Sequence, residues 1–392
     1  MVVMPGAELI GKEERDAVNA VFDRGCMLYR YGFDEAKGEI SQVSAFEKSV
    51  AGYLDTKYAY AVSSGTAALK CALIGMGVRP GDEIITQSHT FVATVEAIIE
   101  VGAVPVIAEV NKTLNMDPSD FKKKITAKTR AVIPVHMAGV PAQMNEIGQI
   151  AKKHDLMILE DSAQALGATY FGKHAGAMGN AAILSFDYGK MITSGEGGMV
   201  LTNKKDIYQR AREYADHGHE MNPRFPRGKD TRTIAGFNFR MMELQGAIGV
   251  EQMKKIDYAI KCQRSNKKTI KEGILEAKGL EFREIPDPSG EICDTLIFFL
   301  KDSKKALKFA EGLQNREIYT KNLPDAIKWH FAGTWDHMLP AFSRYKNKDL
   351  MKIWPESAKH MERSVAIAIN ILMTEEEIDQ RVKSINAIAK SL

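Results

Sequence analysis

Short β-rich runs alternate with helical stretches through the first half of the chain, and this alternation limits the fold more than any other feature. The predicted strands cover residues 58–62, 83–86, 104–110, 131–136, 156–160, 183–186 and 199–202. Predicted helices at residues 65–76, 90–101 and 142–154 lie between them. Strands that are joined by crossover helices pair in parallel and are buried on both faces. The sequence therefore predicts an α/β fold with a mostly parallel central sheet.

The pattern changes after Asn238. Residues 244–277 predict one or two long helices rich in Lys and Glu, and a strand at 295–301 and helices at 304–314 and 375–389 follow. A single hydrophobic core stops growing near about 250–300 residues, and this chain has 392. We therefore predict a large domain over residues 1–240, which includes an N-terminal segment, and a smaller C-terminal α+β domain over residues 241–392.

Composition argues against several classes of function. The formal net charge is only +3, with both signs interleaved, which argues against a nucleic-acid partner. The four cysteines form no C-x-x-C pair, so neither a metal site nor a redox motif is expected. The N-terminus lacks a signal-peptide pattern, and no apolar run approaches the ~20 residues of a membrane span. We expect a cytoplasmic protein that does not contact a membrane.

Residues 63–69, Ser-Ser-Gly-Thr-Ala-Ala-Leu, mark the point where the first predicted strand ends and a helix begins. The first amides of a helix lack partners inside the helix and carry a partial positive charge. Small residues let an anion approach these amides closely, and the Thr66 hydroxyl adds a donor. We expect a phosphate cradle at Gly65 and Thr66. The alternative is an ordinary turn with a Ser or Thr cap.

Asp161 follows the apolar run at residues 156–159 and Glu160, at the carboxyl end of a predicted buried strand. Ligands of open α/β sheets bind at this end of the strands. A buried carboxylate is costly unless a cation lies beside it, and a protonated pyridine nitrogen would be such a cation. The alternative interpretation is an aspartate that caps the following helix.

Lys190 lies in a loop between two apolar β-runs, after Ser185-Phe186-Asp187-Tyr188-Gly189 and before the glycine-rich residues 194–198. A lysine forms a Schiff base readily when burial or nearby cations lower its pKa. Most lysines are solvated surface charges, but the position of Lys190 between two strands argues against that. Phe91 follows the second predicted strand, where its ring either stacks on a flat ligand or packs in the core.

These features occur in order at the ends of successive strands: a cradle, an aromatic ring, a carboxylate and a lysine. Together they match pyridoxal 5′-phosphate (PLP), which a lysine holds as a Schiff base and whose ring nitrogen pairs with an acid. The acid keeps that nitrogen protonated, so that the ring can accept electrons. The lysine, once released, becomes the base that moves the proton. The sequence therefore predicts a PLP enzyme with Lys190 as its catalytic residue.

The chain resembles the DegT/DnrJ/EryC1/StrS family of sugar aminotransferases over nearly its whole length. The resemblance is carried by residues 64–69 (Ser-Gly-Thr-Ala-Ala-Leu), 161–164 (Asp-Ser-Ala-Gln), Ser185-Phe186 with Lys190, and 195–198 (Gly-Glu-Gly-Gly). It implies the fold of type I PLP-dependent transferases, which is aspartate aminotransferase-like. It also implies a homodimer with shared active sites.

The resemblance further implies a role for each motif residue. The residues implied to contact PLP are Gly65, Thr66, Phe91, Asp161, Gln164, Ser185, Lys190 and Asn238. Gly65, Thr66 and Ser185 would bind the phosphate, and Gln164 would lie near the ring hydroxyl. Asn238 would reach the phosphate of the neighbouring subunit's cofactor.

The family also implies the reaction. Its dehydratase branch carries His where this chain has Lys190, so amino transfer is expected and dehydration is not. L-glutamate is the implied amino donor, and a keto or aldehyde sugar is the implied acceptor. Residues 28–32, 185–187, 216–219 and 328–330 resemble a subgroup that aminates the C8 aldehyde of an oxidised octulosonate for lipopolysaccharide. The alternative acceptor is a nucleotide-linked 4-keto-6-deoxy sugar.

Candidate substrate contacts lie outside the cofactor motifs. They are His217, His219, Arg240, Trp329 and His330. For the histidines and the tryptophan, packing or an ordinary surface position is the alternative. A basic stretch within residues 222–232 is equally open to two interpretations, because it either clamps an anion or is a solvated loop. Its cationic residues are Arg224, Arg227, Lys229 and Arg232.

Two other classes of protein match parts of the pattern. A non-catalytic regulator on the same fold would not need to keep Lys190, Asp161 and Gln164 together. A nicotinamide oxidoreductase needs G-x-G-x-x-G after its first strand. Here Gly75-Met76-Gly77 comes at a predicted helix end, and the last glycine, Gly81, is one place late. The sequence disfavours both classes.

Overall fold

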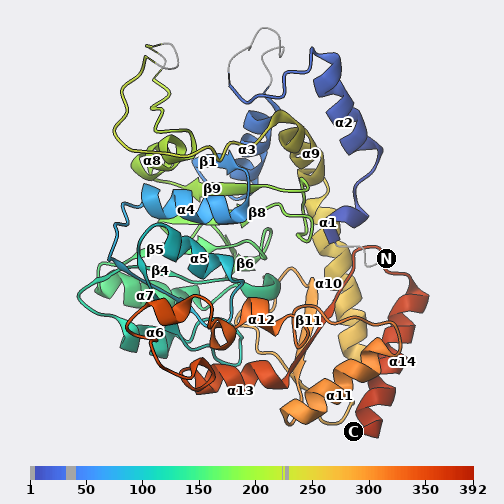
Figure 1. The fold of residues 1–392 in the computed structure, drawn as a ribbon. Helices are drawn as coiled ribbons and strands as arrows, with labels where there is room; N and C mark the ends of the chain where they lie inside the picture. The colour runs from blue at the N-terminus through green and yellow to red at the C-terminus, as the bar shows by residue number, and fades with distance from the viewer. Residues whose placement is uncertain (1–4, 32–40, 223, 226–228) are drawn as a thin grey trace.

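The computed structural model describes residues 5–31, 41–222, 224–225 and 229–392 (Figure 1). Gly32, from one of the segments that resemble the octulosonate subgroup, lies outside the described residues, as does Arg227 of the basic loop. Among the residues that the structure describes, no helix is both long enough and apolar enough to cross a bilayer.

In the described part of the chain, seven strands form the central sheet, in the order β1-β9-β8-β5-β4-β2-β3. Strands β8, β5, β4, β2 and β3 pair in parallel, whereas β9 is antiparallel to both β8 and β1. No helix separates β9 from β8, and a parallel pair would need a crossover connection. The predicted mostly parallel α/β sheet is confirmed. Its strands are β1 (Tyr58–Val62), β2 (Glu83–Gln87), β3 (Val104–Ala108), β4 (Thr129–Ile133), β5 (Met157–Asp161), β8 (Ala181–Ser185) and β9 (Gly198–Thr202).

Helices cover both faces of this sheet (Figure 1). Adjacent strand residues point to opposite faces, so Ile183 of β8 belongs to the core that includes residues of α4, α5 and α8, while Leu184 belongs to the core that includes Phe46 of α3. Separate hydrophobic cores therefore lie on the two sides of the strands, and α6 and α7 cover a further one that contains Ile85 and Val132. The covering helices are α3 (Gln42–Tyr53), α4 (Gly65–Gly75), α5 (Ala93–Glu100), α6 (Pro118–Lys124), α7 (Met144–Lys153), α8 (Lys205–Ala215) and α9 (Glu243–Met253).

The N-terminal segment packs on α9 and on the loops of the central sheet. It contains α1 (Pro5–Glu8) and α2 (Lys12–Asp23), and α2 lies against α9 (Figure 1). Glu14 on α2 is buried, and its Oε1 accepts hydrogen bonds from Gln252 Nε2 at 2.8 Å and from Lys255 Nζ at 2.6 Å. The buried charge is therefore paired, which fixes this segment against the rest of the molecule.

The C-terminal part has its own sheet and core. Strands β10 (Glu281–Phe282), β11 (Thr295–Phe299) and β12 (Ser364–Ala368) form an antiparallel sheet in that order. Phe298 of β11, Phe309 and Ile385 fill the core between this sheet and the helices. The predicted strand near residue 295 is present, but β10 and β12 were not predicted. The domain boundary at residue 240 stays a prediction.

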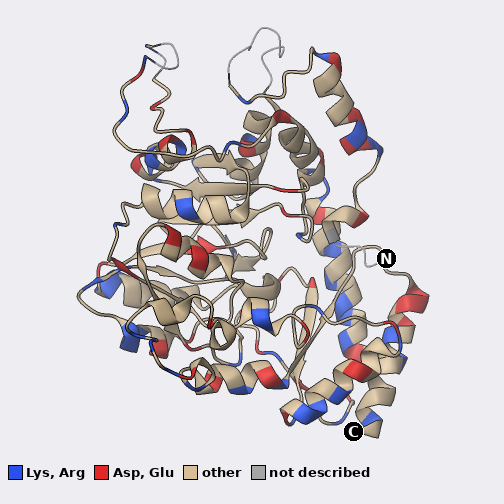
Figure 2. Ribbon diagram, in the orientation of Figure 1, with Lys and Arg blue, Asp and Glu red and all other residues tan. Residues whose placement is uncertain are grey.

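Charged residues of both signs lie along the outer helices of this part (Figure 2). One or two long helices were predicted over residues 244–277. The structure has two, separated by a break at Lys254 and Lys255. The remaining helices are α10 (Ile256–Gly273), α11 (Ser303–Gln314), α12 (Ile327–His330), α13 (Pro355–Arg363) and α14 (Glu375–Ser391). Short elements complete the described fold: the hairpin β6 (Thr169–Tyr170) and β7 (Lys173–His174), and single 3-10 turns η1 (Met137–Gly139), η2 (Ala332–Thr334), η3 (Leu339–Ala341) and η4 (Leu350–Lys352).

Candidate active site

A cavity of about 430 Å³ lies at the carboxyl ends of the central strands. Its walls come mainly from the loops that follow β1, β2, β5 and β8, and Lys321, Asn322 and His330 of the C-terminal part complete it. The two parts meet here through backbone contacts: His89 and Phe331 form an antiparallel bridge, and Val92 N–H donates to Trp329 O at 2.9 Å. The pocket therefore lies on a seam between segments that are far apart in the sequence.

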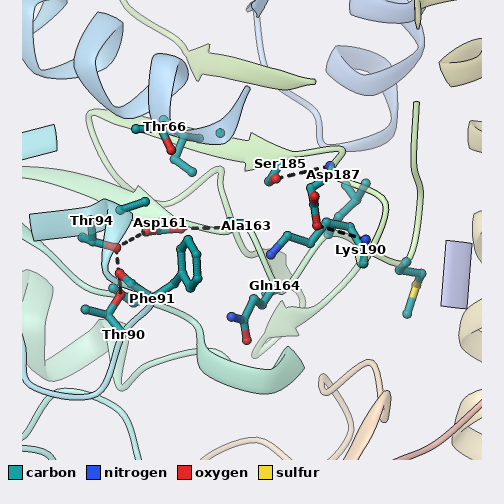
Figure 3. A pocket seen from close by; sticks show the side chains of 18 of the residues that line it. Thr66, Thr90, Phe91, Thr94, Asp161, Ala163, Gln164, Ser185, Asp187 and Lys190 are labelled. Carbon is teal, nitrogen blue, oxygen red and sulfur yellow. Dashed lines mark hydrogen bonds between the residues drawn. The ribbon is translucent and has the colours of Figure 1, made fainter. Parts of the chain in front are cut away.

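Lys190 enters this pocket from the loop that follows β8. Its side chain points toward the space shared by Phe91, Asp161 and Gln164 (Figure 3). Burial, the largest influence, lowers the pKa of the Lys190 ammonium, and the nearby Asp187 carboxylate acts in the opposite direction. A lysine of lowered pKa holds a larger fraction of neutral amine at physiological pH, and only the neutral amine is a nucleophile.

Three hydrogen bonds fix the backbone of the Lys190 loop. Lys190 N–H donates to Asp187 O at 3.0 Å, and Gly189 N–H donates to Asp187 Oδ1 at 2.9 Å. From the N-terminal segment, Gly6 N–H donates to Lys190 O at 2.9 Å. A Cβ atom on Gly6 would lie only 2.5 Å from that oxygen, so only glycine allows this approach. The N-terminal segment thus supports the loop that carries the lysine.

Asp161 lies at the end of β5 with its side chain in the pocket wall. Its Oδ2 accepts a hydrogen bond from Thr94 Oγ1 at 2.8 Å, and its Oδ1 accepts one from Ala163 N–H at 3.1 Å (Figure 3). Burial raises the pKa of this carboxyl, and these two bonds act to lower it. Among the described residues, no cation forms an ion pair with Asp161. The charges of Lys190 and His136 act on this carboxylate from nearby, but neither side chain pairs with it directly, so the buried charge is only partly balanced.

A small cradle forms where α4 begins. Ser64 is the N-cap residue, and its Oγ accepts from Ala67 N–H at 3.1 Å. Gly65, Thr66 and Ser185 line the same end of the pocket. A Cβ atom on Gly65 would lie 2.9 Å from Ser185 Cβ, so glycine keeps this space open. Helix amides and hydroxyls that converge on an open space are suited to an anion such as a phosphate.

Phe91 and Gln164 complete the wall around the lysine. The Phe91 side chain is 42% exposed and its ring faces the pocket (Figure 3). Gln164 Oε1 accepts a hydrogen bond from Ala138 N–H at 3.0 Å. Among the described residues, its NH₂ group has no hydrogen-bond partner, which leaves two donors for a bound molecule.

His330 is the one predicted substrate contact that lines the Lys190 pocket in the described structure. Its Nδ1 lies 2.9 Å from Ala326 O, so Nδ1 carries the hydrogen and Nε2 is an acceptor. Burial lowers the pKa of His330, and the charges of Lys190 and Lys321 act in the same direction. Trp329 is 59% exposed and stacks on Phe91 at 6.3 Å, beside the pocket.

The other predicted residues lie elsewhere. Asn238 and Arg240 line a separate hollow of about 270 Å³ with Tyr29, and Arg240 forms an ion pair with Asp216. His219 is buried and pairs with Asp230 at 3.1 Å. The structure does not bring these residues, or the exposed His217, into the pocket of Lys190 in the same chain.

Several pocket residues were not predicted from the sequence. Thr94, Asp294, Lys321 and Asn322 all line the cavity. Thr94 carried a usable signal, because it follows Phe91 by three residues and helical spacing places both on one side. Asp294 and Lys321 carried none, since their approach to Lys190 depends on how the C-terminal sheet packs.

The residues present fit PLP. The cradle of Gly65, Thr66 and Ser185 suits its phosphate, and Asp161 has the buried charge that a pyridinium nitrogen would balance. Lys190 has the lowered pKa and the position to bind its aldehyde. One pocket thus offers a complementary group for each part of the molecule.

The fold and the pocket together define a PLP-dependent enzyme of the type I transferase fold, and the predicted enzyme class and cofactor are confirmed. The chain belongs to the DegT/DnrJ/EryC1/StrS aminotransferase family, whose family model matches residues 11–386. It is a PLP-dependent sugar aminotransferase, and the regulator and oxidoreductase alternatives are set aside.

Comparison with known proteins supports this membership. The chain is 31% identical over 397 residues to the spore coat polysaccharide biosynthesis protein SpsC of Bacillus subtilis. This match covers 97% of this chain and 96% of that protein. It is 41% identical over 215 residues to GDP-perosamine synthase of Caulobacter vibrioides, but this match spans only 54% of the chain and 56% of that enzyme. The solved aminotransferase of Psychrobacter cryohalolentis superposes with a TM-score of 0.84 at 27% identity, over 97% of this chain and 98% of that one.

Proposed function

We propose that this aminotransferase takes the amino group of L-glutamate and transfers it to the carbonyl carbon of a sugar, in two half-reactions at the Lys190 pocket. Bound PLP supplies a carbonyl that takes up the amino group and a ring that withdraws electrons from the substrate carbon. Lys190 anchors the cofactor through Nζ. Once an incoming amine has displaced Lys190, its neutral Nζ would move the proton from the carbon that loses the amino group to the carbon that receives it.

The other pocket residues hold the reacting groups in place. The Asp161 carboxylate stabilises positive charge at the ring nitrogen, while the cradle of Gly65, Thr66 and Ser185 binds the phosphate. The Phe91 ring covers one side of the cofactor and restricts water. The Gln164 NH₂ group donates toward the ring hydroxyl. Each role follows from the donor, acceptor or charge that the residue directs into the pocket.

We further propose that the acceptor is the C8 aldehyde of an oxidised octulosonate, which would give 8-amino-3,8-dideoxy-D-manno-octulosonate for lipopolysaccharide. The observation that carries this proposal is the charge of the pocket. Among the described lining residues, the only cations are Lys190 and Lys321, whereas Asp161, Asp187, Glu196 and Asp294 are acidic. Such a wall opposes the two or more negative charges of a diphosphate more strongly than the single carboxylate of an octulosonate, and its carboxylates can accept hydrogen bonds from sugar hydroxyls.

His330 and Trp329 are proposed to contact this acceptor. The hydrogen bond from His330 Nδ1 to Ala326 O fixes the ring and leaves Nε2 as an acceptor. This Nε2 atom could accept a hydrogen bond from a sugar hydroxyl. The exposed face of Trp329 lies beside Phe91 and suits the apolar face of a sugar ring. His217, His219 and Arg240 would contact substrate only through a second subunit.

A nucleotide-linked 4-keto-6-deoxy sugar is the second candidate acceptor. It is favoured by the 41% identity with GDP-perosamine synthase of Caulobacter vibrioides. The cations for its diphosphate would then come from a second subunit, because Arg240 and Arg30 line the separate hollow near Asn238.

One experiment separates the two acceptors. The enzyme is loaded with PLP, converted with glutamate to the amino form of the cofactor and freed of excess donor. It is then mixed with the octulosonate aldehyde or with a nucleotide-linked 4-keto-6-deoxy sugar. Return of the visible absorption band with the octulosonate alone supports the proposal. Return with the nucleotide sugar alone would replace it with the second candidate.

We also propose a homodimer in which Asn238 reaches the partner's cofactor phosphate. Asn238 lies outside the pocket of its own chain, and exposed apolar side chains surround it: Tyr29, Phe237 and Met242. Such a patch is typical of an interface.

Mixing two inactive variants tests this arrangement. A Lys190→Ala subunit still supplies Asn238, and an Asn238→Ala subunit still supplies Lys190. If sites are shared, the mixed dimer contains one intact site and recovers activity. No recovery after subunit exchange, verified with differently tagged chains, would show that each site is built within one chain.

A further inference from the structure

Lys321 and Asp294 form an ion pair in the wall of the Lys190 pocket. Lys321 Nζ donates to Asp294 Oδ2 at 2.6 Å, and the two side chains are 21% and 11% exposed. Both residues line the cavity. The pair is thus largely sheltered from water, at a place where a bound molecule can still reach it.

The C-terminal sheet holds this pair rigidly. Lys321 N–H donates to Ala366 O of β12 at 2.8 Å, and Asp294 O, next to the start of β11, accepts from Ile369 N–H at 2.9 Å. Thr295 Oγ1 donates to Asp294 Oδ1 at 2.9 Å. Sites built on paired strands are held more precisely than sites on free loops. The position of the Lys321 ammonium is therefore set by the fold.

The ammonium keeps donors for a ligand. It has three N–H groups, and in the described structure Asp294 is the single hydrogen-bond acceptor that Nζ contacts. Lys321 is also the only cation besides Lys190 among the described lining residues. Any carboxylate that enters the pocket has Lys321 as its available positive partner in this chain.

Lys321 also acts on the reacting centre. Its charge influences Lys190, lowering the pKa of that ammonium, and the Asp294 charge acts in the opposite direction. In an amino acid, the α-carboxylate is one bond away from the carbon that carries the amine. This carbon must react beside Lys190 Nζ. We therefore expect the attached α-carboxylate to lie within reach of Lys321, the other cation that lines the same pocket.

We propose that Lys321, oriented by Asp294, is the residue that binds the α-carboxylate of the amino donor. This inference rests on the proposed amino-acid donor, and it does not depend on which sugar accepts the amine. Asp294 neutralises the ammonium between turnovers and holds it in one orientation, so that a carboxylate meets a preformed donor. Lys321 is thereby the residue that makes the site select α-amino acids over simple amines.

The test uses the PLP-loaded full chain without any sugar. Lys321→Met removes the charge at similar length, and Lys321→Gln serves as the second neutral variant should the first fail to fold. Lys321→Arg restores a cation. The matched control is Lys301→Met, which makes the same change at an exposed residue. Lys301 lies just after β11, whereas Asp294 lies just before it.

Two readouts are taken: KM and kcat of the glutamate half-reaction, and dissociation constants of α-methyl-L-glutamate and 2-aminoisobutyrate. Both probes lack the α-hydrogen, so they bind without transfer. The second probe also lacks the side-chain carboxylate. We expect the neutral variants to raise KM and both dissociation constants roughly 10- to 100-fold, with a smaller change in kcat. The arginine variant should recover part of the loss, and Lys301→Met should match the unmodified protein.

Two results would overturn the inference: unchanged dissociation constants in well-folded neutral variants, or weakening of α-methyl-L-glutamate alone, which would assign Lys321 to the side-chain carboxylate. Failure of the proposed donor looks different, because the unmodified enzyme itself would then neither react with glutamate nor bind α-methyl-L-glutamate.

Discussion

Thr94 Oγ1 donates a 2.8 Å hydrogen bond to Asp161 Oδ2, which joins the start of α5 to the end of β5 inside the pocket. A second hydroxyl, Thr90 Oγ1, lies 2.7 Å from Thr94 Oγ1. Because Thr94 gives its hydrogen to the carboxylate, Thr90 is the donor in that second bond. The two hydroxyls form a short chain that ends on Asp161 and favours its ionised form.

Thr94→Val should therefore weaken catalysis by raising the pKa of Asp161. Burial already raises that pKa, and the Thr94 bond opposes the rise. A bond to a charged group is worth about 1.5–3 kcal/mol, so we expect kcat to fall roughly 10- to 100-fold and the acid limb of the pH–rate profile to move to higher pH. A matched control is Thr126→Val, which removes a similar 2.6 Å bond to Glu83 away from the pocket. An unmoved acid limb would contradict the role of Thr94.

The rate of cofactor loading should depend on pH through Lys190. Only the neutral amine attacks the PLP aldehyde, and burial lowers the pKa of Lys190. The loading rate should therefore rise with pH and reach a plateau. The pH at which it is half-maximal should lie below about 10.4, the ordinary pKa of a lysine. Stopped-flow absorbance of the cofactor-free protein mixed with PLP measures this midpoint. A midpoint at or above the ordinary value would mean that the lysine is solvated.

Much of the sheet and of the cofactor pocket follows from local sequence. Alternating strands and helices predict the sheet. Gly65 and Lys190 follow strands and Asp161 ends one, and the carboxyl ends of these strands lie at one edge of the sheet. These residues therefore had to meet, whatever the packing around them. The resemblance to a known family added their roles.

The rest depends on contacts that have no local signal. Strand β12 follows α13 without a turn signal, and its place in the small sheet depends on pairing with β11. Lys321 reaches the pocket because of that pairing and because Phe331 bridges to His89 across the seam. Strand β9 is antiparallel to β8 because the loop between them contains no helix. Predicting each strand separately does not give its direction.

Gly65→Ala should weaken cofactor binding. The added methyl group would lie 2.9 Å from Ser185 Cβ and would enter the space proposed for the phosphate. We expect the PLP dissociation constant to rise roughly tenfold or more, as expected for loss of a charge-assisted hydrogen bond. Gly52→Ala is the matched control, since a Cβ atom there meets nothing within 4 Å. Equal PLP affinity in both variants, measured by titration, would argue against the cradle.

Glu160→Gln should destabilise the fold. Glu160 and His136 are fully buried with 3.0 Å between Oε2 and Nε2, and Glu160 Oε1 accepts from Met178 N–H and Gly179 N–H at 2.6 Å each. His136 Nδ1 accepts from Ala142 N–H, so its Nε2 donates to Glu160. A neutral amide would direct an NH₂ group at donors, and each buried group left without a partner costs about 1–3 kcal/mol.

Urea unfolding measures this loss of free energy. The control is Glu251→Gln, whose ion pair with the largely exposed Lys254 contributes at most about 1 kcal/mol. Similar unfolding free energies for the two variants would contradict the structural role of the buried pair.

The central claim is that Lys190 holds PLP and releases it to an amino donor. The most direct measurement is borohydride reduction of the PLP-loaded enzyme, which makes the lysine linkage permanent, followed by peptide mass spectrometry. The account predicts a phosphopyridoxyl group on Lys190, and its loss from that peptide when the enzyme is treated with L-glutamate before reduction. A label on a different lysine, or one that glutamate does not remove, would contradict the account.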